Sequence, residues 1–200
     1  MNLWIITVNF GETSATKSLI DSLSSLINFE SVKIGIADNA ATDKTSYHLK
    51  QIADSSKLDI EIFSNQKNLY YWPAAKRVIK KLKKIYKFYP DWIIVCNNDI
   101  TFTDQNFLKK LSNLNKKEYP IVGPRIIDSD GHDLNPFMNT PLSKFQYFFW
   151  ELYFISYSTS ILISFFRNFI KFFMFGLKTK TSTINKQVYA VHGSMILFSN

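Results

Sequence analysis

Residues 92–99 read WIIVCNND, a short apolar run followed at once by two amides and a carboxylate. A run of this length, rich in β-branched residues, predicts a strand buried on both faces of a sheet. Residues 3–8, 32–37 and 58–63 are predicted to form further strands, and amphipathic stretches separate them. Because such alternation is typical of βαβ units, we predict an α/β fold with a mainly parallel sheet flanked by helices.

Helices are predicted between these strands. Asp43 can cap the second helix, and the third is expected over residues 72–89 with Pro73 in its first turn. A fourth helix is expected over residues 104–115, and residues 121–124 and 188–198 read as later strands. The first helix has its apolar side chains at helical spacing, namely Leu19, Ile20, Leu23, Leu26 and Ile27.

The composition indicates a folded chain with an anionic partner. The 200 residues are 46% hydrophobic and carry a net charge of +8, which excludes a disordered or low-complexity protein. The positive charge favours nucleic acid, nucleotide phosphates or an acidic membrane surface as the partner. The single cysteine, Cys96, excludes an internal disulfide and fits a cytoplasmic compartment. The first ten residues lack the basic region of a signal peptide, so none is predicted.

Residues 141–182 are predicted to be a helical insertion between an α/β part, residues 1–140, and its final strand within residues 183–200. No charged residue lies between Glu151 and Arg167, but that run spans only about 22 Å as a helix, against about 30 Å for a bilayer core. Polar positions share one predicted face, and Phe-rich positions share the other. The polar positions are Ser156, Ser160, Ser164, Arg167 and Lys171, and the apolar ones are Phe154, Ile161, Leu162, Phe165, Phe169, Phe172 and Phe173.

Such an amphipathic, cationic helix is expected to lie in a membrane interface. The alternative is packing on the sheet or on a second copy of the chain, as in a homo-oligomer. The basic run over residues 76–87 is either a solvated helix face or a second attraction to an anionic membrane. No recognisable nucleic-acid-binding motif accompanies it, so we expect no nucleic-acid partner.

Polar residues follow four of the predicted strands. They are Thr7-Val8-Asn9, Asp38-Asn39, the stretch 65–68 and Asn97-Asn98-Asp99. Ligands of open α/β sheets bind beyond the carboxyl ends of the strands, although an Asp-Asn pair can also form a simple turn. Asp99 offers a carboxylate suited to Mg²⁺ or Mn²⁺, with water and phosphate oxygens completing the shell.

Several other site classes are excluded. The sequence has no GxGxxG after its first strand, no GxxxxGK[ST] and no GxSxG, which excludes dinucleotide, P-loop and α/β-hydrolase sites. Cys96 lies within a predicted buried strand and is expected to be inert. His48, His132 and His192 lack metal-ligand spacing, and only His192, beside Gly193, is kept as a candidate.

Six short motifs occur in a fixed order along the chain. They are T-V-N at 7–9, D-N-A-A-T-D at 38–43, N-L-Y-Y-W at 68–72, C-N-N-D at 96–99, V-G-P-R-I at 122–126 with D-G at 130–131, and V-H-G-S-M-I-L at 191–197. In this order they resemble the family-2 glycosyltransferases of the GT-A fold, especially the rhamnosyltransferase-like branch. Tyr70 stands where that family usually has a glycine.

The resemblance implies a metal-assisted, inverting transfer of a sugar from a nucleotide-sugar donor to a glycan or lipid-linked acceptor, in polysaccharide biosynthesis. Asp99 would hold Mg²⁺ or Mn²⁺, and Asp38 would contact the base or ribose. The remaining donor-binding residues would be Thr7, Val8, Asn9, Asn39, Asn68, Asn97, Asn98 and Gly193. His192 would lie on the acceptor side, and the enzyme would be peripheral on the inner face of a bacterial cell membrane.

The catalytic base of the family is expected in an acidic motif after the last strand, and no Asp or Glu follows Glu151 here. The resemblance therefore implies that the C-terminal part is lacking, that the chain is inactive, or that another acid such as Asp128, Asp130 or Asp133 replaces the base. A non-catalytic or truncated nucleotide-sugar-binding protein and a membrane-surface adaptor are the alternative functions.

Overall fold

The computed structural model describes residues 1–26, 31–173 and 187–200, with side chains left out over 166–173. The chain divides into two compact units. The first comprises Met1–Ile126 and Val191–Asn200, and the second comprises Ile127–Ala190. The second unit contains the predicted insertion 141–182 and is longer at both ends. Residues 174–182 of that insertion, residues 183–186 and Ile27 of the first predicted helix lie outside the described residues.

The first unit is built on a six-stranded sheet with the order β3-β2-β1-β4-β6-β5. The strands are β1 (Leu3–Phe10), β2 (Val32–Asn39), β3 (Asp59–Asn65), β4 (Trp92–Asn97), β5 (Ile121–Val122) and β6 (Met195–Ser199). β3, β2, β1 and β4 are parallel, whereas β6 runs antiparallel to both β4 and β5. The predicted α/β fold with a mainly parallel sheet is confirmed.

The final strand begins later than predicted. Its prediction covered residues 188–198, but β6 starts only at Met195. The preceding residues turn at Gly193 and Ser194, where the Ser194 N–H donates to His192 Nδ1 at 3.3 Å. The Ser194 carbonyl accepts from the Asn97 N–H at 2.8 Å, so this turn is joined to the end of β4.

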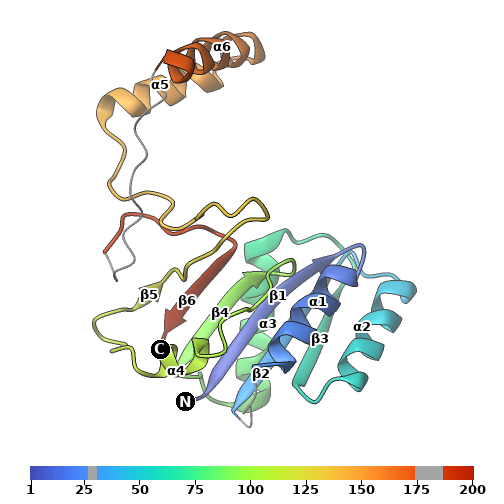
Figure 1. Ribbon diagram of the computed structural model, residues 1–200. Helices are drawn as coiled ribbons and strands as arrows, with labels where there is room; N and C mark the ends of the chain where they lie inside the picture. Colours follow the sequence, from blue (N-terminus) through green and yellow to red (C-terminus); the bar gives the residue numbers. More distant parts are fainter. Residues whose placement is uncertain (27–30, 174–186) are drawn as a thin grey trace. The chain divides into compact units, whose positions relative to one another are not determined.

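Helices cover both faces of the sheet (Figure 1). α1 (Ser14–Ser24) and α2 (Asp43–Ser55) lie in front of it in this view, and α3 (Tyr71–Tyr86) lies behind it. Thr42, not Asp43 as predicted, caps α2, because its hydroxyl accepts from the Thr45 N–H at 3.1 Å. α4 (Phe107–Ser112) is shorter than the predicted helix over residues 104–115.

The alternation of side chains along the strands builds the core beneath α3. Trp4 and Ile6 of β1 pack in one buried cluster with Val78 and Leu82 of α3. Gly35 of β2 lies so close to this helix that an added Cβ would collide with Val78. The lysine-rich stretch predicted as a solvated helix face therefore belongs to a helix whose opposite side is buried.

The second unit contains two helices, α5 (Lys144–Phe154) and α6 (Tyr157–Phe173), where one continuous amphipathic helix was predicted. Ser156, placed by the prediction on the polar face, lies between the two helices and caps the start of α6, because it forms reciprocal hydrogen bonds with Thr159. The Tyr153 hydroxyl lies 3.3 Å from that of Ser164, and the two helices run side by side (Figure 1). Within the described ranges of the chain, no helix is long and apolar enough to cross a membrane.

Candidate functional site

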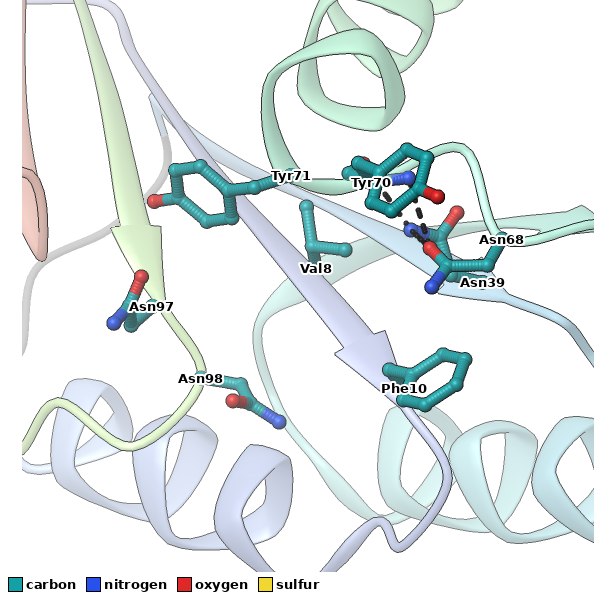
Figure 2. Close-up of a pocket in the computed structure, with 8 residues that line it drawn as sticks. All are labelled: Val8, Phe10, Asn39, Asn68, Tyr70, Tyr71, Asn97 and Asn98. Carbon is teal, nitrogen blue, oxygen red and sulfur yellow. Dashed lines mark hydrogen bonds between the residues drawn. The ribbon is translucent and has the colours of Figure 1, made fainter. Parts of the chain in front are cut away.

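A cavity of about 310 Å³ opens beyond the carboxyl ends of β1, β2 and β4. Figure 2 shows the residues that line it, which come from these strand ends and from the start of α3. They are Val8, Phe10, Asn39, Asn68, Tyr70, Tyr71, Asn97 and Asn98. Five of these were predicted as donor-binding residues from the sequence, namely Val8, Asn39, Asn68, Asn97 and Asn98.

The pleat of the strands decides which of the other predicted residues reach this cavity. Successive side chains of a strand point to opposite faces of the sheet, so Thr7 and Asn9 point away from the side that Val8 lines. On β2, Asp38 likewise points away from the side of the sheet on which Asn39 lines the cavity. Thr7, Asn9 and Asp38 are completely buried, and none of them lines the cavity.

Asp38 is held by side chains from two elements, β1 and α2. Its Oδ1 accepts from Asn9 Nδ2 at 3.2 Å, and its Oδ2 accepts from the hydroxyls of Thr45 at 3.0 Å and Ser46 at 3.3 Å. Both carboxyl oxygens therefore accept hydrogen bonds, and the side chain is completely buried. A contact between Asp38 and a base or ribose requires that the side chains around it move.

Thr16 of α1 joins the ends of β1 and β4 and was not predicted as a site residue. Its hydroxyl donates to Asn9 Oδ1 at 2.8 Å and accepts from Asn98 Nδ2 at 3.1 Å. The signal was present in the sequence, because Thr16 shares a helix face with Leu19, Ile20 and Leu23. A polar residue on the apolar face of a helix needs a buried partner.

A second group of amides shapes the opposite rim of the cavity. Asn39 Nδ2 donates to Asn68 Oδ1 and to the Tyr70 carbonyl, both at 3.2 Å. Asn39 Oδ1 accepts from Asn65 Nδ2 at 2.9 Å. Asn68 itself is exposed, and its Oδ1 also accepts from the Tyr70 N–H at 2.8 Å. These side chains fix the backbone that leads into α3.

Two buried hydroxyls have no hydrogen-bond partner among the described residues, that of Tyr71, which lines the cavity, and that of Thr7, which points to the other face of the sheet. Burial raises the pKa of the Tyr71 phenol far above its usual value, and Cys96 and Asp99 raise it further. The phenol is thus a neutral donor at pH 7. Buried polar groups are normally paired, so the Tyr71 hydroxyl indicates a place for a ligand atom or water.

Asp99 lies in the turn after β4 and is exposed, as expected of a metal-binding carboxylate at a strand end. It is close enough to Cys96 and Tyr71 to raise the pKa of both groups. Burial is the larger cause for Cys96 and raises its pKa to about 12, so this thiol is inert, as predicted from its strand. One carboxylate with neighbouring amide oxygens fits Mg²⁺ or Mn²⁺ when phosphates supply further ligands.

His192 and Gly193 are tied to the same strand end by the hydrogen bond between Ser194 and Asn97. An added Cβ at Gly193 would meet no atom within 4 Å, so its surroundings are open. His192 is half-buried. Neither residue lines the cavity, and their predicted roles remain predictions.

In the second unit, Asp128, Asp130 and His132 bring possible metal-ligating atoms within 4.8 Å of one another. Asp128 Oδ1 accepts from the backbone N–H groups of Asp130 and His132 at 3.0 and 2.8 Å. These bonds, the one to His132 first, hold the pKa of Asp128 below its usual value. The arrangement is that of a tight turn.

The sequence profile of glycosyl transferase family 2 matches residues 4–185 of the 200. The chain belongs to this family. The match covers both units and agrees with the motif order. No curated protein sequence matches the chain.

Several solved structures have a similar fold. Staphylococcus aureus TarS 1-349 is 14% identical with a TM-score of 0.54, over 70% of this chain and 40% of that one. A complex of the same protein with UDP-GlcNAc gives a TM-score of 0.53 at 14% identity, over 70% and 39% of the two chains. A mannosyltransferase from Pyrobaculum calidifontis, solved with GDP-Man and Mn²⁺, gives 0.50 at 11% identity, over 64% and 36%. The present chain thus spans well under half the length of these relatives.

Proposed function

We propose that the cavity binds a nucleotide-sugar donor and that the protein takes part in transfer of the sugar to a glycan or lipid-linked acceptor. The observation that carries the proposal is the cavity itself, which has amide side chains at the ends of parallel strands and a buried Tyr71 hydroxyl without a hydrogen-bond partner in the described part of the chain. Membership of glycosyl transferase family 2 supports this chemistry. The donors named for the neighbouring structures, UDP-GlcNAc and GDP-Man, are of the same class.

Asp99, with Asn97 and Asn98 beside it, would hold Mg²⁺ or Mn²⁺. A bound divalent ion offsets the negative charge that develops on a leaving diphosphate. The neutral Tyr71 phenol would donate a hydrogen bond to a donor oxygen at the same end of the cavity. Gly193 would leave room for a sugar beside Asn97, and His192 would face the acceptor.

The remaining predicted residues divide into two groups. Val8, Asn39 and Asn68 line the cavity and would contact the donor there. Thr7, Asn9 and Asp38 are buried under the strand ends, and we propose that the hydrogen bond between Asn9 and Asp38 holds β1 and β2 in register there. Asp38 would reach the base or ribose only if the side chains that bury it moved.

An inverting transfer needs a carboxylate that takes the proton of the acceptor hydroxyl. None of the described residues that line the cavity is Asp or Glu. Donor binding is therefore better supported for this chain than turnover, and a nucleotide-sugar-binding role without catalysis is the second candidate.

A thermal-shift panel tests the proposal. UDP-, GDP- and dTDP-sugars, including dTDP-rhamnose, are added with Mn²⁺, with Mg²⁺ or with EDTA. A ligand at 100 times its dissociation constant stabilises the fold by about 2.7 kcal/mol, which raises the melting temperature by several degrees. We expect a metal-dependent shift with one nucleotide class. No shift with any donor would contradict the proposal.

The second unit supports a location at a membrane surface. None of the side chains of α5 is buried, and its Phe145, Phe148 and Phe154 are 78%, 56% and 75% exposed. Residues 141–182 carry five basic residues against one acidic residue, which are Lys144, Arg167, Lys171, Lys178 and Lys180 against Glu151. Exposed aromatic side chains together with positive charge favour an anionic lipid surface. We propose that the protein is peripheral on the inner face of a bacterial membrane.

Flotation with vesicles separates this proposal from a role as a membrane adaptor without a nucleotide site. The protein should float with vesicles containing anionic phosphatidylglycerol and much less with neutral phosphatidylcholine. Phe145→Ser combined with Phe148→Ser should release it, whereas Tyr47→Ser, an exposed aromatic of the first unit, should not. If the variant with both phenylalanines replaced still floated with the anionic vesicles, the membrane role would be contradicted. Flotation without any nucleotide binding would favour the adaptor.

A further inference from the structure

Tyr70 has a backbone conformation that side chains other than glycine rarely adopt. Its φ is 60° and its ψ is −179°, directly before the first residue of α3. This region of backbone space is essentially restricted to glycine, and a residue with a Cβ is strained in it. The family pattern has a glycine at this position, so the tyrosine of this chain is a departure that costs stability.

The strain is maintained by contacts of the backbone, not by packing of the ring. Asn68 Oδ1 accepts from the Tyr70 N–H, and the Tyr70 carbonyl accepts from Asn39 Nδ2 and from the Ala74 N–H at 3.3 Å. The side chain is 76% exposed and adds little buried area to the fold. Nothing in the folding of the first unit therefore favours a tyrosine here over a glycine.

The ring does, however, line the cavity (Figure 2). Tyr70 and Asn68 lie on one side of Val8, and Asn97 lies on the other, at the strand end that leads to Asp99. Phe10 lines the cavity too and is 62% exposed. Two exposed aromatic rings thus belong to the part of the cavity that is away from the proposed metal.

The direction of the donor follows from these positions. If the diphosphate lies at Asp99 and its metal, the nucleobase must lie toward Asn39, Asn68 and Tyr70. A nucleobase presents a flat π-face, and an exposed tyrosine ring is a suitable surface for stacking.

We propose that Tyr70 is a specificity-determining residue whose ring stacks on the nucleobase of the donor. This inference rests on the proposed function and adds the residue that recognises the base. A glycine at this position would remove the backbone strain, but it would also remove the ring. Tyr70 would therefore contact the nucleobase of a donor in a way that the glycine of the family pattern could not.

The test compares Tyr70→Gly with Tyr70→Phe. Titration calorimetry measures the affinities of UDP, GDP and dTDP, each with Mn²⁺, and of inorganic pyrophosphate with Mn²⁺, which has no base. We expect Tyr70→Gly to weaken the preferred nucleotide roughly tenfold and to leave pyrophosphate unchanged. Tyr70→Phe, which keeps the ring and the strain, should bind like the wild type. The melting temperature of Tyr70→Gly without ligand should equal or exceed that of the wild type.

The outcomes are distinguishable. Equal nucleotide affinity of the wild type and Tyr70→Gly would overturn the role of Tyr70 and leave the proposed function standing. An equal loss of nucleotide and pyrophosphate affinity would also overturn it, because the ring would then act on the phosphates or on the shape of the loop. Absence of nucleotide binding by the wild type would overturn both proposals.

Discussion

The two faces of the sheet differ at the carboxyl ends of the same strands. On the side of α1 and α2, Asn9, Thr16 and Asp38 are buried and hydrogen-bonded to one another or to their neighbours. On the side of α3, alternate residues of the same strands line an open cavity, and none of the residues that the structure describes forms a hydrogen bond with the Tyr71 hydroxyl. One face therefore buries its polar side chains in hydrogen bonds between elements, whereas the other, although Asn39 and Asn68 are also bonded to each other, opens to a cavity that a ligand can enter.

This difference changes how the motifs are interpreted. A polar residue at a strand end is equally visible in the sequence on either face, but its neighbours decide its role. Asp38 belongs to the closed face and Asn39 to the open one, although they are adjacent in the chain. Substitutions on the closed face should thus lower stability, and those on the open face should lower affinity.

The largest expected effect is that of Asp38→Ala on stability. The change removes an acceptor of the buried Asn9 amide and the acceptor that the half-buried hydroxyls of Thr45 and Ser46 share. We expect a loss of roughly 2–4 kcal/mol in the free energy of unfolding, measured by urea denaturation. Asp54→Ala, at an exposed position near the end of α2, is the matched control and should change it by less than about 0.5 kcal/mol. Similar small losses for both variants would show that the buried network is not stabilising.

Asp99→Asn should lower the affinity for the donor and leave the stability of the fold almost unchanged. Asp99 is exposed, so the free energy of unfolding should change by less than about 0.5 kcal/mol. The affinity for the donor in Mn²⁺ should fall at least roughly tenfold, which is about 1.4 kcal/mol, while the affinity in EDTA stays the same. Calorimetry of wild type and variant under both conditions measures this. A wild type that binds equally well with and without metal would contradict the role of Asp99.

The smallest expected signal is the reaction of Cys96 with a thiol reagent. The side chain is fully buried beside the cavity, and burial raises its pKa to about 12, so almost no thiolate exists at pH 8. We expect native protein to react only as fast as it unfolds, and urea-unfolded protein to react at once. Rapid labelling of native protein would mean that the end of β4 is open to solvent.

The sequence was sufficient for the sheet and for much of the cavity, because the strands are short apolar runs and the polar residues directly follow them. It could not reveal which polar residues face the cavity, since a side chain near a strand end can turn either way. Thr16 was missed although its place on the apolar face of α1 was visible, because one of its partners, Asn98, is 82 residues away in the chain. The strained Tyr70 was visible only as a missing glycine, and the break at Ser156 depends on a capping contact that periodicity does not report.

The most direct test of the account locates the donor on the protein. Backbone amide NMR spectra of the 23.3 kDa chain would be recorded with the nucleotide sugar chosen by the thermal-shift panel, first with Mg²⁺ and then with paramagnetic Mn²⁺. We predict that shifts and Mn²⁺ broadening concentrate at Asn97, Asn98 and Gly193. His48 and Gln51, which line a separate hollow of about 300 Å³ along α1 and α2, should be unchanged. Broadening at His48 and Gln51 with none at Asn97 and Asn98 would contradict the central claim.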